Sequence, residues 1–209
     1  MGIDTTHQLK YLNETNRALF LELCHALLME NPDFILDINK FYPIVGGYPD
    51  ILHRAIITKD INFAKLLIQA GIGINARSDN EETSLMLAAR YGQIETIKLL
   101  IAEGVDVNAK DKDGNTALMM AVNYSPLNSE IVSLLIEAGA DVNARNNYNY
   151  TALFFAASNT LSLNILTHLI EHGAEVNVRM DHGYTPLMMA GLLTDGAEIV
   201  KILREHGAR

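Results

Sequence analysis

A segment that recurs five times along the chain constrains its fold more than any other feature. One leucine marks the same place in each copy, and the leucines follow one another at spacings of 33, 33, 35 and 34 residues: Leu52, Leu85, Leu118, Leu153 and Leu187. A unit of this length is one supersecondary motif, which cannot bury its apolar face alone and must stack on its neighbours. The period therefore predicts a solenoid.

Each copy has the pattern of two helices followed by a protruding hairpin. A threonine near the anchor leucine can cap the first helix by accepting a free backbone N–H, and it recurs as Thr83, Thr116, Thr151 and Thr185. Small residues follow it, and the next stretch has apolar residues at helical spacing, as in 97–101 and 131–136. A glycine then ends the second helix in the left-handed conformation.

The ends of the copies carry a second motif. Gly104-Val105-Asp106-Val107-Asn108-Ala109 and Gly139-Ala140-Asp141-Val142-Asn143-Ala144 are two versions of one sequence, and Thr185-Pro186-Leu187 is the fullest version of the start. Over about residues 46–209 the chain resembles the ankyrin-repeat family. The resemblance implies an all-α ankyrin-repeat solenoid of about five helix–turn–helix units with hairpin fingers, whose function is to bind another protein.

Some positions depart from the repeated pattern. The glycine of the finger tip is kept at Gly114 and Gly183, but it is replaced by Asn149 and by Glu81. Asparagine tolerates the left-handed region, whereas Glu81 predicts a finger that turns differently or carries strain. An isoleucine of the second helix becomes Arg204 in the last copy, and this predicts a repeat that ends the stack.

Residues 1–45 match the repeat poorly, so we divide the chain into this segment and a repeat domain over 46–209. An amphipathic helix is predicted from Arg17 to Met29, and we interpret the segment as a helical N-terminal cap or degenerate repeat. The alternative is a separate docking helix or a secretion signal.

Composition limits the choice of partners and compartments. The net charge of −9, with no run of Lys and Arg, argues against nucleic acid and anionic membranes as partners. The lone Cys24 excludes an internal disulfide, and no apolar stretch is long enough to span a membrane. We expect a cytoplasmic monomer, with secretion into a host cell as the alternative.

Nothing in the sequence indicates an active site. Cys24 and His25 are neighbours that point about 100° apart on a helix, so they cannot act together as nucleophile and base. His168, His172 and His206 are explained by helix positions better than by metal binding. We therefore predict no catalytic residue, no metal and no cofactor.

The resemblance places the partner on the concave side, which consists of the finger tips and the exposed face of the first helices. The residues predicted to bind there are Leu87, Arg90, Asp113, Met120, Tyr148, Tyr150, Phe155, His182, Tyr184 and Met189. Aromatic residues and Met are enriched at interfaces, and the partner would be a helix or loop that is apolar or basic. The alternative is that the Met and Phe side chains are core between repeats.

Binding leaves several biological roles open. The chain could be a secreted pathogen effector, or an immunity protein that blocks a toxin by binding it. An enzyme is the least favoured alternative, because the sequence offers no cluster of reactive side chains.

Overall fold

A computed structural model describes residues 51–69, 71 and 73–209. The predicted cap over residues 1–45, with its helix and Cys24, lies outside this range. The described residues form five pairs of helices and no extended strand, apart from one isolated bridge between Arg77 and Thr83. The prediction of an all-α solenoid of about five units is therefore confirmed for the repeat region.

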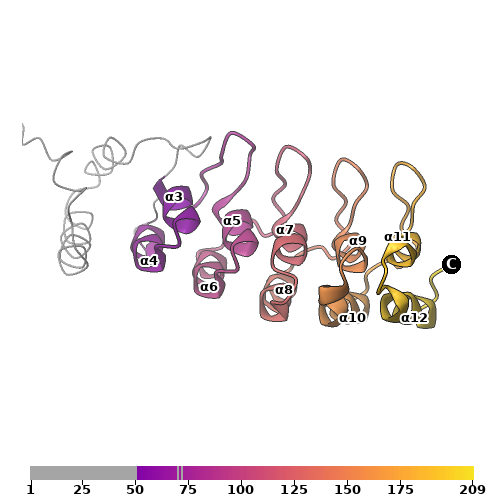
Figure 1. Ribbon diagram of the computed structural model, residues 1–209. Helices are drawn as coiled ribbons and strands as arrows, with labels where there is room; N and C mark the ends of the chain where they lie inside the picture. Colours follow the sequence, from indigo (N-terminus) through magenta and orange to yellow (C-terminus); the bar gives the residue numbers. More distant parts are fainter. Residues whose placement is uncertain (1–50, 70, 72) are drawn as a thin grey trace, which may run out of the picture.

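The units lie side by side in one row (Figure 1). Their first helices are α3 (Ile51–Ile57), α5 (Ser84–Arg90), α7 (Ala117–Tyr124), α9 (Ala152–Ala157) and α11 (Pro186–Leu192). Their second helices are α4 (Ile61–Gln69), α6 (Ile94–Ala102), α8 (Ser129–Glu137), α10 (Leu163–Glu171) and α12 (Ala197–Glu205), with the short 3-10 helix η3 (Thr160–Ser162) before α10.

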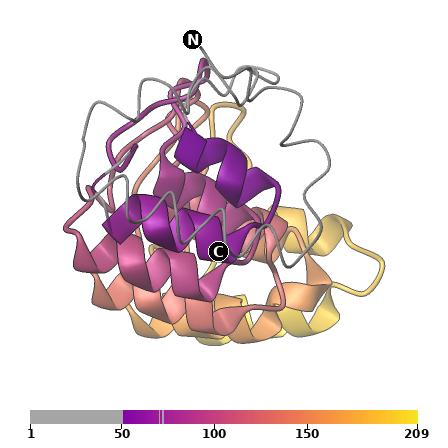
Figure 2. The same cartoon turned by 90° about the vertical axis from the view of Figure 1, so that its left-hand side faces the viewer.

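Hairpin fingers connect each unit to the next, and we define them as residues 76–83, 109–116, 144–151 and 178–185. All four fingers extend to the same side of the helices, and the first helices lie between the fingers and the second helices (Figures 1 and 2). The molecule thus has a finger layer, a first-helix layer and a second-helix layer.

Threonine side chains start four of the first helices, as the sequence predicts. The hydroxyl oxygen of Thr83 accepts the backbone N–H of Met86 at 3.3 Å, and Thr116, Thr151 and Thr185 do the same in their own repeats. Each bond satisfies a backbone donor that the helix cannot, and such a cap typically contributes about 1 kcal/mol. The first helices therefore begin at a fixed residue after each finger.

The core runs both between the two helices of each repeat and from one repeat to the next. First helices pack on first helices, as α5 does on α3 and α7, and second helices pack on second helices. The anchor leucines of the first four units are 0 or 1% exposed, whereas Leu187 of the last unit is only partly buried. Arg204 at the end of the stack is exposed, in agreement with its predicted position on a terminal face.

Asparagines at the ends of the second, third and fourth repeats tie each of these units to the next. The Asn108 side chain donates to the backbone oxygen of Gly139 at 2.9 Å and accepts the backbone N–H of Asp141 at 2.7 Å. Asn143 makes the equivalent pair of bonds one repeat later, and Asn177 makes it to Gly207 and Arg209. These paired bonds fix the spacing between units at one edge of the stack.

The fingers are also bonded to one another. The backbone N–H of Lys112 donates to the oxygen of Asn80 at 3.0 Å, and the N–H of Asn147 donates to the oxygen of Asp113 at 2.8 Å. Gly114 permits this approach, because a Cβ built there would lie 2.9 Å from the backbone nitrogen of Asn147. The adjacent fingers therefore form a continuous wall.

Replacing Gly114 by alanine should destabilise the protein far more than the same change at Gly183. Both glycines have φ +79, so both variants carry the strain of a left-handed alanine. Only the new methyl group at Gly114 meets the next finger, since nothing lies within 4 Å of a Cβ at Gly183. We expect Gly114→Ala to lose roughly 1–3 kcal/mol more in the free energy of unfolding by urea. Equal losses would show that the finger-to-finger contact contributes nothing.

Glu81 adopts the same turn as its glycine counterparts. Its φ is 60°, close to the 59° of Asn149 and near the 79° of the two finger glycines. A residue with a Cβ pays a steric penalty in this region. Of the two expectations for Glu81, a different turn is wrong and a strained turn is confirmed.

Glu81→Gly should therefore stabilise the chain, by about 1 kcal/mol, because it removes that penalty. Asn149→Gly is the matched control. Asparagine tolerates the left-handed region, and the Asn149 side chain also donates to Asp181 at 2.6 Å, so its replacement should bring no gain. Thermal unfolding of both variants tests this, and an unchanged melting temperature for Glu81→Gly would contradict it.

Candidate functional site

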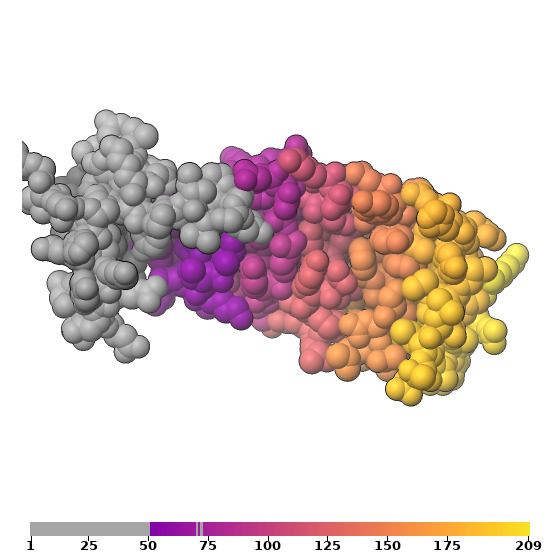
Figure 3. Space-filling model, turned by 45° about the horizontal axis from the view of Figure 1, so that its top comes forward, coloured from indigo at the N-terminus to yellow at the C-terminus, as the bar shows by residue number. Residues whose placement is uncertain are grey.

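A groove of about 460 Å³ lies between the fingers and the first helices. Its walls come from three successive units, namely the first three fingers and helices α5, α7 and α9. Its lining residues are Asn80, Glu82, Arg90, Asp111, Lys112, Asp113, Asn115, Met119, Met120, Asn123, Tyr124, Asn146, Tyr148, Tyr150 and Phe155. Each repeat forms one band across the surface, so any site that runs along the stack combines side chains from several repeats (Figure 3).

Aromatic rings form one end of the groove. Tyr150 stacks on Phe154 with ring centroids 4.6 Å apart, and it meets Phe155 edge-on at 5.8 Å. The ring centroid of Tyr148 lies 5.9 Å from that of Tyr150, and Tyr148 is 51% exposed. The third finger and α9 thus hold a rigid cluster in which Tyr148 is the most accessible ring.

Arg90 occupies the other end of the groove. Its guanidinium forms an ion pair with the buried carboxylate of Glu82 in the preceding finger. The same group lies 5.0 Å from the ring centroid of Tyr124 and 3.4 Å from the sulfur of Met120. A carboxylate, an aromatic ring and a soft sulfur atom from two successive repeats therefore hold one cation in the groove.

The two aspartates of the second finger differ in what they bind. The Asp111 carboxylate accepts the backbone N–H groups of Asp113 and Asn115 at 3.0 and 2.7 Å, and also the side-chain amide of Asn115 at 3.1 Å. It therefore stabilises the turn of its own finger. Asp113 is exposed, and within the described part of the chain its carboxylate accepts no hydrogen bond. Asp113 is thus the carboxylate that the finger leaves available in the groove.

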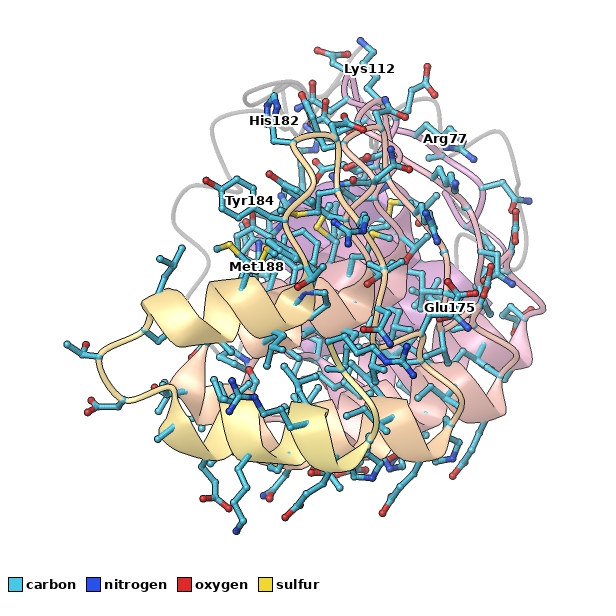
Figure 4. The ribbon with its side chains drawn as sticks, turned by 90° about the vertical axis from the view of Figure 1, so that its right-hand side faces the viewer. Arg77, Lys112, Glu175, His182, Tyr184 and Met188 are labelled. Carbon is cyan, nitrogen blue, oxygen red and sulfur yellow. The ribbon has the colours of Figure 1, made fainter. Side chains whose placement is uncertain are left out.

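Six of the ten predicted binding residues line this groove: Arg90, Asp113, Met120, Tyr148, Tyr150 and Phe155. His182 and Tyr184 lie on the fourth finger, outside the groove. Tyr184 points to the same side of the finger layer as Met188, while Arg77 and Glu175 lie on the opposite side (Figure 4). Tyr184 and Met188 are 45 and 49% exposed, so the last unit also carries exposed apolar side chains.

The exposure expected for the first-helix residues needs correction. Leu87 is 0% exposed and is core between repeats, so its predicted place on an open surface is wrong. Met120 is only 4% exposed and reaches the groove through its sulfur atom, and Met189 is partly buried. Leu87 and Met120 are covered because the following repeat packs on their helices. Met86, Met119 and Phe154 are buried as well, as the core alternative had it.

Two accessible residues were missing from the predicted set. Tyr124 is 55% exposed, lines the groove and is the last residue of α7, just before the turn to α8. Met188 is 49% exposed although its counterparts are buried, because the described residues contain no further repeat to cover it. The terminal position of its repeat was the signal that could have identified it.

His168, His172 and His206 lie on second helices or at their ends and make local contacts. The ring of His168 hydrogen-bonds the Ser133 hydroxyl at 3.1 Å, and the Nδ1–H groups of His172 and His206 donate to backbone oxygens at 2.8 Å. Within residues 51–69, 71 and 73–209, no group of three potential ligands is placed to hold a metal ion. No helix in these ranges is long and apolar enough to cross a membrane.

Charge pairs far from the groove are exposed and weak. Lys98 on α6 bridges to Glu130 on α8 at 3.1 Å, and this hydrogen bond raises the pKa of the Lys98 ammonium above its usual value. Arg145 pairs with Glu175 at 3.1 Å in the same exposed manner. The pair between Arg90 and Glu82 is, by contrast, largely withdrawn from water.

Removing Arg90 should therefore destabilise the chain more than removing Arg145. The Glu82 side chain is 4% exposed, so Arg90→Ala takes the guanidinium away from a buried carboxylate and should cost about 2 kcal/mol or more. Both partners of the Arg145 pair are well exposed, and Arg145→Ala should cost less than about 1 kcal/mol. The free energies of unfolding of both variants are measured with urea. A smaller loss for Arg90→Ala than for Arg145→Ala would show that the pair of Arg90 and Glu82 does not stabilise the fold more than an exposed pair.

Comparison with known proteins agrees with this architecture. A family model described as ankyrin repeats, in three copies, matches residues 52–146 and again residues 127–209. A search of curated proteins finds no matching sequence. The two matches together span the whole stack of helix pairs and more than half of the sequence. The chain belongs to the ankyrin-repeat family.

Proposed function

We propose that the chain binds another protein in the groove between its first three fingers and helices α5, α7 and α9. Ankyrin repeats generally mediate protein–protein interaction, and this supports the class of function. The observation that carries the choice of site is the composition of the groove, in which exposed aromatic rings and polar groups from three repeats lie together.

The groove has the chemistry of an interface rather than of a solvated surface. Tyr124 and Tyr148 are 55 and 51% exposed, and leaving such large rings in water has a free-energy cost that a partner would relieve. Tyrosine gives large contact area with little loss of side-chain entropy, and residues of this kind dominate binding energy at interfaces.

The wall of the groove is preorganised. The finger containing Tyr148 is bonded through Asn147 to the finger before it, and Tyr150 is fixed against Phe154. A partner that binds here does not have to order these side chains, so less of the interaction energy is lost. The partner would be a helix or loop that places apolar or basic side chains in the groove.

Changing Tyr148 and Tyr150 together to alanine should weaken partner binding by more than about 1 kcal/mol. The partner is first captured from the native source with the wild-type chain and identified by mass spectrometry. Its affinity for each variant is then measured by calorimetry. Tyr148→Ala alone should show most of the loss, because that ring is exposed and removing it leaves the stacking of Tyr150 on Phe154 intact.

The control removes exposed apolar surface elsewhere. Ile61 on α4 is 45% exposed and lies outside the groove, so Ile61→Ala should leave the affinity unchanged. Melting temperatures of all variants are compared to separate binding from folding. Unaltered affinity of a folded Tyr148→Ala, Tyr150→Ala variant would show that the groove is not the binding site.

A further inference from the structure

The groove already holds one cation in a way that indicates what a partner would bring to it. Arg90 is held by a carboxylate of one finger and by the ring of Tyr124 from the next repeat. Its charge is therefore matched inside the protein. This arrangement shows which kind of group the groove stabilises, namely a flat cation between a carboxylate and an aromatic face.

The same combination recurs one repeat later, without an internal cation. Asp113 provides a carboxylate that accepts no hydrogen bond from the described residues, and the adjoining finger provides the exposed ring of Tyr148. The two fingers are joined by the bond from the backbone N–H of Asn147 to the backbone oxygen of Asp113 at 2.8 Å. A carboxylate and an aromatic ring from successive repeats thus line the same groove, on two fingers that are bonded to each other.

Among the described residues, the other charges that line the groove form no ion pair with Asp113. Of the five charged residues in the lining, Glu82 and Arg90 pair with each other and Asp111 is bonded within its own turn. Lys112 lies at the tips of the fingers, where its ammonium is exposed (Figure 4). A negative net charge of −9 over the whole chain adds a general attraction for a basic partner.

We propose that the partner inserts an arginine side chain, whose guanidinium stacks on the ring of Tyr148 and pairs with the carboxylate of Asp113. This inference rests on the proposed function and specifies the chemistry of the partner. Arginine fits better than lysine, because its planar guanidinium can stack on an aromatic ring and bond a carboxylate at the same time. The apolar part of the arginine side chain would cover the rings of Tyr150 and Phe155.

The test uses the ¹⁵N-labelled full chain titrated with Nα-acetyl-arginine amide and followed by NMR. The neutral isostere Nα-acetyl-citrulline amide and Nα-acetyl-lysine amide are titrated in parallel. We expect saturable shifts of amide signals in the second and third fingers, with a dissociation constant roughly in the millimolar range. Binding of the lysine probe should be weaker, and binding of citrulline weaker by about tenfold.

Two variants with the same net charge distinguish binding at Asp113 from a general electrostatic attraction between the probe and the acidic chain. Asp113→Asn should reduce arginine binding to the level of citrulline, and Glu137→Gln on α8, which also removes one exposed carboxylate, should leave it unchanged. Equal shifts with arginine and citrulline would overturn the proposal. An equal loss in the two variants, or the absence of shifts in the second and third fingers, would overturn it as well.

The two experiments tell failure of the arginine preference apart from failure of the proposed protein-binding function. If the tyrosine variants lose the native partner but the arginine probe does not bind, the groove remains the protein-binding site and the arginine preference is wrong. If the arginine probe binds at Asp113 but the tyrosine variants keep the partner, the proposed function is wrong while the cation site stands.

Discussion

Burial of one repeat by the next is the interaction on which the whole described structure depends. Met86, Met119 and Phe154 occupy equivalent positions and are 1, 2 and 5% exposed, since a following repeat covers each of them. Met188 occupies the same position in the last repeat and remains 49% exposed. The contrast shows that a single unit has no complete core, so that its stability comes from its neighbours. On the second helix of the last repeat, the charged Arg204 replaces the isoleucine of the inner repeats and stands on the face that no described repeat covers.

The stacking of helices also determines the geometry of the groove. Because the fingers follow the first helices at a constant interval, side chains such as Glu82, Asp113 and Tyr148 come from different repeats yet point into one groove. Backbone bonds between adjacent fingers then fix their separation, and Gly114 removes the one Cβ that would prevent this. Binding chemistry is thus placed on a scaffold whose rigidity arises from contacts between nearest neighbours.

The period and the helix caps could be predicted from the sequence, because both are local properties. A threonine caps the helix that follows it, and an anchor leucine is buried wherever a neighbour exists. Side-chain exposure could not be predicted in the same way, since it depends on the neighbouring unit. Leu87 was therefore placed on the surface although it is core, and Met188 was left out although it is exposed. The exposure of Tyr124 depends on where α7 ends relative to its neighbours, and the pairing of Arg90 with Glu82 depends on the distance between a finger and a helix.

The asparagine bonds between units have a consequence for how such a protein changes length. Each bond of Asn108, Asn143 and Asn177 reaches a residue 30 to 33 positions further along the chain. Duplication or loss of one whole unit would give every asparagine an equivalent new acceptor and donor. An insertion of one or two residues inside a finger would instead shift the backbone groups that bond it to the adjacent finger. Gene rearrangements can therefore lengthen or shorten this scaffold in whole modules, whereas small insertions are tolerated in the turns between helices, where the chain already varies.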